Sequence, residues 1–192
     1  MSDEIAKLGD AVDATVTRNA GSVELLGLQG VYTADCYDAQ GNLKWSDSIK
    51  NLTTNVGRKS LLDSYFANTG GGAVVMGLKG TGTAAYADTQ ASHATWLEVG
   101  ATNAPTYSGT RKTPAFSAAT SANPSVLSTS AAVVFSMTGS GTVAGAFINI
   151  GGSSTIDSTT GTLFSAGDFT AGSKTVTSGD TINVSYTLSA SG

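Results

Sequence analysis

His93 is the only histidine of the chain and the natural starting point for any catalytic site. Ser92 precedes it, and Asp88 and Glu98 each lie five residues away, so a Ser–His–acid triad is the chemistry these residue types could supply. Adjacent residues of a strand or helix point in different directions, however, so the Ser92 hydroxyl cannot readily face the imidazole. We therefore expect the imidazole to pack or hydrogen-bond within its own loop. We predict no catalytic residue and no enzymatic activity.

Residues that could bind a metal ion are few. Transition-metal sites use several His or Cys ligands, whereas this chain has one of each, Cys36 and His93, far apart in the sequence. A single cysteine also excludes an intramolecular disulfide, so we expect Cys36 to be buried in the core. Four polar residues superficially resemble a calcium-binding loop: Asp35, Asp38, Gln40 and Asn42. They lack the alternating oxygen ligands and the final glutamate of such a loop, so we interpret them as turn residues and predict no metal or other cofactor.

Glycine-rich and basic stretches could bind an anionic ligand or partner. The glycines of 70–72 and 77–82 are not followed by the Gly-Lys-Ser/Thr of a phosphate-binding loop, so we expect them in tight turns. Two Arg-Lys doublets are the first candidates for contacts with an acidic partner: Arg58, Lys59, Arg111 and Lys112.

The elements that must position these residues are mostly β-strands. The clearest strand alternates apolar and polar residues from Ile182 to Leu188, with Val184 and Tyr186 on the apolar face, which is typical of a half-buried strand. Turn residues at 177–180 predict that 174–176 doubles back onto this strand. Val133 to Met137 and Val143 to Ile150, separated by Gly139-Ser140-Gly141, predict another hairpin.

The first half of the chain adds a hairpin, a helix and a short strand. Residues 31–37 and 43–49 flank a polar turn at 38–42, which predicts a hairpin. A helix is expected over about 53–66, capped by Asn51 or Thr53. A short buried strand should follow at 73–78.

Residues 80–110 give the weakest pattern. We expect a long loop, with a turn of helix at 88–93 and with Trp96 and Leu97 packed inward. After it, residues 112–117 are predicted to form an edge strand, because Pro114 has no amide hydrogen to donate to a neighbouring strand.

About nine strands and one helix predict an all-β fold. We expect a two-sheet β-sandwich of jelly-roll or Greek-key type with one inserted helix, over residues 26–192 as a single domain. We expect residues 1–25 to form an N-terminal arm, and they carry a sparse apolar stripe: Ile5, Leu8, Val12 and Val16. This spacing is too wide for a strand, and glycine and β-branched residues weaken a helix.

The composition narrows the class of protein. Charged residues make up 12% of the chain, about half the share of roughly 25% in average soluble proteins, which favours a surface covered by neighbouring subunits. The formal charge of −4 argues against nucleic-acid binding, which needs clustered Lys and Arg. The acidic start is unlike a signal peptide, and no apolar run is long enough to cross a membrane, so we expect synthesis in the cytoplasm and no membrane partner.

Several motifs together resemble the virion structural proteins of tailed bacteriophages, over roughly residues 31–188. They are Gly41-Asn42-Leu43-Lys44-Trp45, Asn51-Leu52-Thr53-Thr54-Asn55-Val56-Gly57, Ala91-Ser92-His93-Ala94-Thr95-Trp96-Leu97-Glu98, Asn103-Ala104-Pro105-Thr106-Tyr107, Arg111-Lys112-Thr113, Gly161-Thr162-Leu163-Phe164-Ser165-Ala166-Gly167-Asp168-Phe169 and Ser178-Gly179-Asp180-Thr181-Ile182-Asn183-Val184-Ser185-Tyr186. Within that group the chain is similar to the cement, or decoration, proteins of short-tailed phages. The resemblance implies a jelly-roll that binds the outer surface of the capsid and locks its capsomers together.

The resemblance also implies the partners and the location. The major capsid protein is the expected partner, the outer capsid surface of the virion is the expected location, and stabilisation of the head is the expected role. We also expect self-association, with a dimer favoured over a trimer. A tail or tail-fibre component is the alternative, whereas a glycan hydrolase would need a carboxylate pair that no pattern indicates. We expect the arm, through its four apolar residues, to contribute more to capsid attachment than to folding, unless it packs onto its own sandwich.

Overall fold

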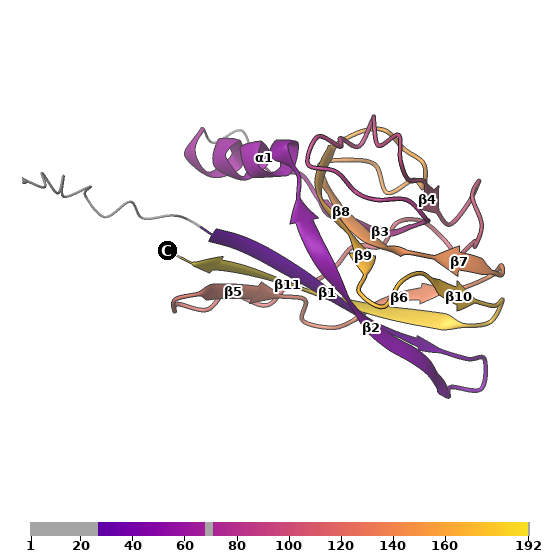
Figure 1. Cartoon of the computed structure of the whole chain (residues 1–192). Helices are drawn as coiled ribbons and strands as arrows, with labels where there is room; N and C mark the ends of the chain where they lie inside the picture. Colours follow the sequence, from indigo (N-terminus) through magenta and orange to yellow (C-terminus); the bar gives the residue numbers. More distant parts are fainter. Residues whose placement is uncertain (1–26, 68–70, 192) are drawn as a thin grey trace, which may run out of the picture.

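Residues 27–67 and 71–191 are described by a computed structural model and form eleven strands and one helix (Figure 1). In chain order the elements are β1 (Gly27–Tyr37), β2 (Leu43–Thr53), α1 (Asn55–Phe66), β3 (Val74–Lys79), β4 (Glu98–Val99), β5 (Ser125–Ser128), β6 (Val133–Ser136), β7 (Gly141–Val143), β8 (Gly145–Ile150), β9 (Thr162–Phe169), β10 (Lys174–Val176) and β11 (Thr181–Ser191). The prediction of a mainly β chain with one helix is therefore confirmed, with two strands more than expected.

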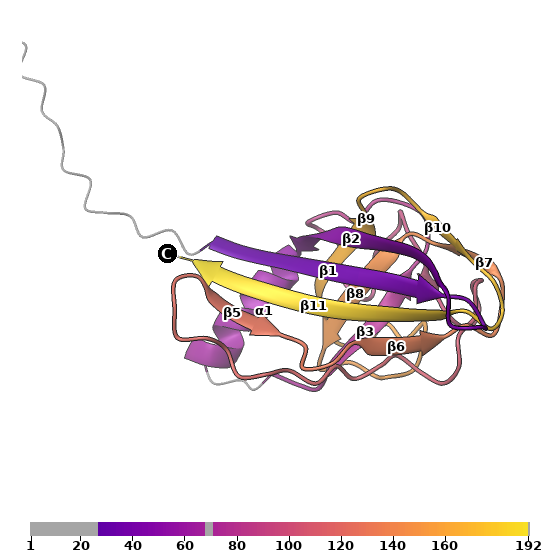
Figure 2. The same ribbon diagram turned by 90° about the horizontal axis from the view of Figure 1, so that it is seen from below.

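One antiparallel sheet contains nine of these strands, in the order β4-β3-β8-β9-β2-β1-β11-β5 with β6 also beside β11. β2 joins the two halves, because it pairs with β1 as far as Lys50 and with β9 over Ile49 to Thr53. Figure 2 shows β3, β8 and β9 crossing behind β1 and β11, and Figure 1 shows them on one side of these two strands, so the sheet forms two facing layers. The layered all-β arrangement is as predicted, but both layers belong to one sheet. The jelly-roll or Greek-key topology stays a prediction.

The core lies between the layers and follows from the period-two pattern of the strands. Ile182, Val184 and Tyr186 of β11 are buried, as predicted, while the residues between them are partly exposed. β1 pairs with β11 along its whole length and adds Tyr32, whose ring centroid lies 4.6 Å from that of Tyr186. Cys36 is buried in the same cluster, as expected. Burial and a nearby carboxylate raise the pKa of its thiol to about 11, so the thiol stays protonated at neutral pH.

The helix begins two residues later than predicted, and a different residue caps it. The Thr54 hydroxyl accepts a hydrogen bond of 2.9 Å from the Gly57 amide, so Thr54, and neither Asn51 nor Thr53, is the N-cap. Gly57 costs helix propensity, but it lies against β9: a Cβ there would come within 2.2 Å of the Phe164 carbonyl oxygen. The helix can approach the sheet closely only because this residue is glycine.

The hairpin of β1 and β2 is confirmed, and its turn is held by Asp38. The Asp38 carboxylate accepts hydrogen bonds from the amides of Gln40 and Asn42, at 2.9 and 2.8 Å. A hydrogen bond from the Asn42 side chain contributes most to lowering the pKa of Asp38, and the bonds from the backbone amides lower it further. Of the polar residues that superficially resemble a calcium loop, Asp38, Gln40 and Asn42 therefore serve as turn residues, whereas Asp35 lies within β1.

The two C-terminal hairpins were predicted with the wrong partners. β6 pairs with β11 and not with residues 143–150, and β10 pairs with β7 and not with β11. Alternation shows which face of a strand is buried but not which strand lies beside it. In this sheet β1 covers one edge of β11, while β5 and β6 share the other, so no edge remains for β10.

Two predicted elements between β3 and β5 are absent from this part of the described chain. Residues 112–117 make only isolated bridges, from Lys112 to Met76 and from Phe116 to Thr129, because Pro114 between them donates no amide. Residues 88–93 form a tight turn instead of a turn of helix, in which the backbones of Thr89 and Ser92 exchange two hydrogen bonds.

Candidate functional site

The weakly patterned segment 80–110 and the segment 151–161 pack together on β3 and β8, and we call these two segments the loop region (Figure 1). Its apolar centre is Trp96, which is 1% exposed and packs on Phe147 and Leu163. Leu97 is 60% exposed, so the prediction that both residues pack inward is wrong for Leu97. Consecutive residues of an extended segment point to opposite sides, which allows only one of them to enter the core.

Charged groups hold Trp96 in place. The ammonium of Lys79 is fully buried, lies 2.5 Å from the Asp168 carboxylate and sits over the Trp96 ring at 5.6 Å from its centroid. Its remaining donors reach the carbonyls of Gly80 and Gly82. At the edge of the ring, the indole N–H donates to Asp88 at 2.9 Å. A buried tryptophan thus has both its face and its polar atom partnered, as such residues require.

Arg111 forms a buried ion pair with Glu98 of the loop region. The guanidinium donates to both carboxylate oxygens, at 2.9 and 2.6 Å, and both side chains are almost fully buried. It also donates to the carbonyls of Ser153 and Ser158, and Glu98 accepts the amide of Asp157 at 2.9 Å. The prediction that Arg111 contacts a partner at the surface is wrong, because its donors are all directed into its own chain.

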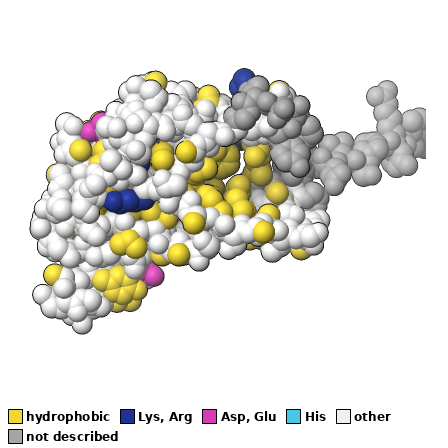
Figure 3. All heavy atoms as spheres, turned by 180° about the vertical axis from the view of Figure 1, so that it is seen from behind, with side chains coloured by type: hydrophobic (Ala, Val, Ile, Leu, Met, Phe, Trp, Pro, Cys, Tyr) yellow, Lys and Arg dark blue, Asp and Glu magenta, His cyan; other side chains and the backbone are white. Residues whose placement is uncertain are grey.

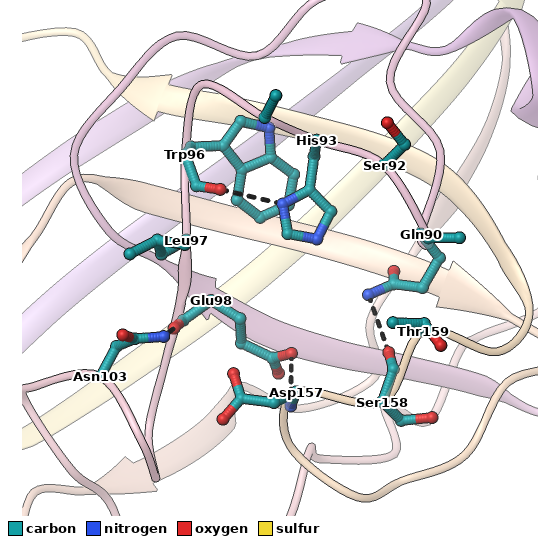
Figure 4. A pocket seen from close by; sticks show the side chains of 12 residues that line it. Gln90, Ser92, His93, Trp96, Leu97, Glu98, Asn103, Asp157, Ser158 and Thr159 are labelled. Carbon is teal, nitrogen blue, oxygen red and sulfur yellow. Dashed lines mark hydrogen bonds between the residues drawn. The ribbon is translucent and has the colours of Figure 1, made fainter.

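A hollow of about 380 Å³ lies beside this ion pair, with Glu98 in its wall (Figure 4). His93 stacks on Trp96 with ring centroids 4.0 Å apart, and its Nδ1 lies 2.9 Å from the Trp96 carbonyl oxygen. A carbonyl only accepts, so Nδ1 carries a proton, and in the neutral imidazole Nε2 is the acceptor that Figure 4 shows directed into the hollow. Gln90 and Asp157 line the hollow from the neighbouring segments.

The electrostatics of this region are dominated by burial. Tyr107 packs edge-on against Phe135, with ring centroids 5.0 Å apart, and its buried hydroxyl has no hydrogen-bond partner in the described chain. Desolvation, followed by the negative charge of Glu98, raises the pKa of Tyr107 above its ordinary value of 10. Its phenol is therefore neutral at every physiological pH.

The structure pairs the residues of the hypothetical triad with other groups. Asp88 accepts the Trp96 indole and the Ala85 amide, and Glu98 pairs with Arg111. The expectation that the imidazole of His93 packs and hydrogen-bonds within its own loop is confirmed. His93 therefore belongs to the hollow as a wall residue.

The remaining predicted contact residues are dispersed. Arg58 is exposed on α1, where its guanidinium lies over the Tyr86 ring, and Lys59 next to it is also exposed. Lys112 is half-buried, donates to the Ser108 carbonyl at 2.6 Å and belongs to a different part of the chain. The other four candidates lie outside the described residues: Ile5, Leu8, Val12 and Val16.

Several residues of the hollow were not predicted from the sequence, among them Gln90, Asn103 and Asp157. Asn103 anchors the loop by donating to the Glu98 carbonyl at 2.9 Å, and Gln90 donates to the Ser158 carbonyl at 3.3 Å. No local pattern marks Gln90, whose partner Ser158 is 68 residues away, or Asn103, whose bond to Glu98 five residues away depends on the path of the loop. Asp157 stands in a polar, turn-forming run, Ser-Thr-Ile-Asp-Ser-Thr-Thr-Gly, which signals a loop without indicating its role.

Neither a membrane-spanning helix nor a metal-binding cluster occurs in the part of the chain that the structure describes. Within residues 27–67 and 71–191, no helix is sufficiently long and apolar to cross a membrane. The same residues contain no group of three His, Cys, Asp or Glu side chains placed to hold a metal ion. No protein-family model, no curated protein and no solved structure matches the chain.

Proposed function

We propose that this chain is a capsid decoration protein of a short-tailed bacteriophage, which binds the outer surface of the major capsid protein shell and stabilises the head. The proposal rests on one observation above all, an extended and nearly uncharged sheet face. The resemblance of its motifs to phage virion proteins gives that face its expected partner.

This face, which we call the outer face, is the side of β1, β2 and β11 turned away from the core, and Figure 2 looks onto these strands. Its residues are directly opposite one another in the ladders, so they share one surface. They are Gln29, Val31, Thr33, Asp35, Ser46, Ser48, Lys50, Asn183, Ser185, Thr187 and Ser189. Nine of the eleven are uncharged, which keeps the cost of removing water from this surface low.

The size of the outer face suits a stable interface. β1 and β11 have eleven residues each, which corresponds to roughly 35 Å of strand, and adjacent strands lie about 4.8 Å apart. Three strands thus offer about 500 Å² of flat surface, more than half of the ~800 Å² per partner in a standard interface. Hydroxyl and amide side chains can hydrogen-bond to a partner there without burying a charge.

The rest of the surface supports a role in an assembly. From behind, the molecule also shows few charged side chains (Figure 3). Repeated over a shell, many modest interfaces resist expansion together, because each capsomer is held by several copies at once. Self-association as a dimer or trimer is part of the proposal, and the mass of the purified protein in solution tests it.

Binding to undecorated phage heads tests the proposal directly. Thr33→Arg places a long charged side chain at the centre of the outer face, and we expect it to reduce binding at least tenfold without changing the melting curve. Thr175→Arg, on the exposed side of β10, is the matched control and should bind like the wild type. Co-sedimentation with heads, followed by protein quantification, measures both variants.

Copy number and position separate the head from the tail. A decoration protein should approach a fixed ratio to the major capsid protein and appear on the shell in cryo-electron microscopy. Detection of the chain only at the tail would replace the proposal by the tail or tail-fibre alternative. Full decoration by the Thr33→Arg variant would instead exclude the outer face as the attachment surface.

A further inference from the structure

We propose that the hollow of the loop region binds a neutral saccharide, an activity separate from attachment to the capsid. The proposal comes from the acceptors, the apolar side chains and the fixed backbone that converge on the hollow. Figure 4 shows these groups around one cavity, contributed by the two segments of the loop region.

The charges around the hollow exclude an anionic ligand. None of its lining residues is Lys or Arg, and the Arg111 guanidinium behind it is occupied by Glu98. Asp157 contributes an exposed carboxylate, which accepts one long hydrogen bond, of 3.4 Å, from the Thr102 amide. A phosphate or a sugar acid placed here would face a carboxylate with no cation to balance it.

The polar groups of the hollow are mainly acceptors. His93 Nε2 and the Asp157 carboxylate accept hydrogen bonds, and the hydroxyls of Ser92 and Thr159 can accept or donate. The Oε1 atom of Gln90 is a further acceptor, buried in the wall and without a partner in the described chain. A ligand rich in hydroxyl donors is the chemical complement of this set.

Apolar side chains also line the hollow. Leu97 is 60% exposed, and the lining residues Ala91 and Ala94 of the same segment are exposed as well. A sugar ring has C–H groups on its faces and hydroxyls on its edge, so it can rest on these side chains while its edge meets the acceptors. The volume of about 380 Å³ is at the small end of the usual range of roughly 300–1,000 Å³, which fits one or two sugar rings.

The backbone of Asp157 indicates that the site is preorganised before any ligand binds. Its φ of 65° is the only positive φ of a non-glycine residue in the described chain, and such a conformation is unfavourable for a residue with a Cβ. Glu98 holds the Asp157 amide, and Arg111 holds the carbonyls of Ser153 and Ser158 on either side. A buried ion pair thus fixes a strained loop that presents one carboxylate, as preorganised binding sites do.

The single histidine of the chain provides a direct readout. We would titrate the full-length protein with glucose, galactose, mannose and N-acetylglucosamine, and follow the imidazole C–H signals of His93 by proton NMR. At least one of these neutral sugars should shift the signals and saturate, whereas glucuronic acid and N-acetylneuraminic acid should bind at least tenfold more weakly. Absence of a saturable shift with all four neutral sugars would overturn the proposal, as would equal binding of the acids.

Two variants localise the binding. Asp157→Gly removes the carboxylate and relaxes the backbone, so it should keep or raise the melting temperature while weakening the neutral sugar at least tenfold. Asp35→Asn removes the same charge from the outer face, away from the hollow, and should leave sugar binding unchanged. Unweakened binding by Asp157→Gly would exclude the assigned site. Heads should still be decorated by Asp157→Gly, which separates a failure of this proposal from a failure of the proposed function.

Discussion

The strand core and the loop region fill the interior in different ways. Between the layers, β1 and β11 bury alternate apolar residues such as Tyr32 and Val184, and their backbones are satisfied by regular ladders. The loop region has only the two-residue β4, and it covers the buried ammonium of Lys79 and the almost fully buried ion pair of Arg111 with Glu98. In the strand core, the ladders satisfy the backbone hydrogen bonds, so apolar side chains can fill the interior. In the loop region, the irregular backbone lacks such ladders, and side chains must provide hydrogen-bond partners for its amides and carbonyls.

The largest effect is expected from breaking the strand core. Val184→Asp places a carboxylate where the side chain is fully buried, and an unpaired buried charge of this kind should cost more than about 4 kcal/mol. Since small domains are stable by only about 5–15 kcal/mol, the variant should be unfolded or nearly so. Circular dichroism and thermal melting measure this, and a soluble variant with the wild-type melting curve would refute the position of Val184 in the core.

Breaking the loop region should cost less and act locally. Arg111→Met leaves Glu98 charged and unpaired, which typically costs about 3–5 kcal/mol. The double variant Arg111→Met, Glu98→Gln should recover part of this loss because no buried charge remains. Hydrogen exchange should show residues 153–160 opening in the single variant while β1 and β11 keep their protection. Uniform loss of protection over all strands would mean that the two regions do not differ in this way.

A pH-dependent pair at the edge of the strand core sharpens the comparison. Burial of Asp47 opposes ionisation, but hydrogen bonds from Lys174 and Thr170 outweigh it and lower its pKa from 3.8 to about 2. A lowered folded-state pKa adds stability above pH 4 that is lost as the pH falls to about 2. Asp47→Asn should therefore lose about 1–2 kcal/mol at pH 7 and little at pH 2, as urea denaturation at both pH values would show. An equal loss at both would argue against the ion pair.

The smallest effect is expected where the two regions meet. Tyr107 packs on Phe135 of the strand core, yet its buried hydroxyl has no partner in the described chain. Tyr107→Phe removes this unsatisfied group and keeps the ring, so it should leave stability unchanged or raise it by up to about 1 kcal/mol. A clear loss in chemical denaturation would reveal a hydrogen bond to that hydroxyl in solution.

The sequence predicted the two regions unequally, for a physical reason. Alternation at Ile182 to Leu188 and the turn at Asp38 depend on neighbours in the chain, so the buried face of β11 and the first hairpin were predicted correctly. The partners of β6 and β10 depend on which sheet edges are free, which no local pattern encodes.

The hollow was harder to predict than any strand. The Arg111-Lys112 doublet favoured a surface position for Arg111. Its acidic partner, Glu98, is thirteen residues away, and their contact depends on the path of the loop. Asp157 joins them from 59 residues beyond Glu98. His93 could be predicted to bond within its own loop, since its partner Trp96 is only three residues away.

The pairing of β1 with β11 has a consequence for how the protein bears tension. Gly27 lies directly opposite Ser191, so the beginning of one strand and the end of the other are side by side. The bonds of an antiparallel ladder are perpendicular to the strands, and a force that pulls these two ends apart therefore breaks the bonds one after another. The same ladder pulled along its length would load all its bonds at once. The proposed attachment through the outer face would not pull on these two ends.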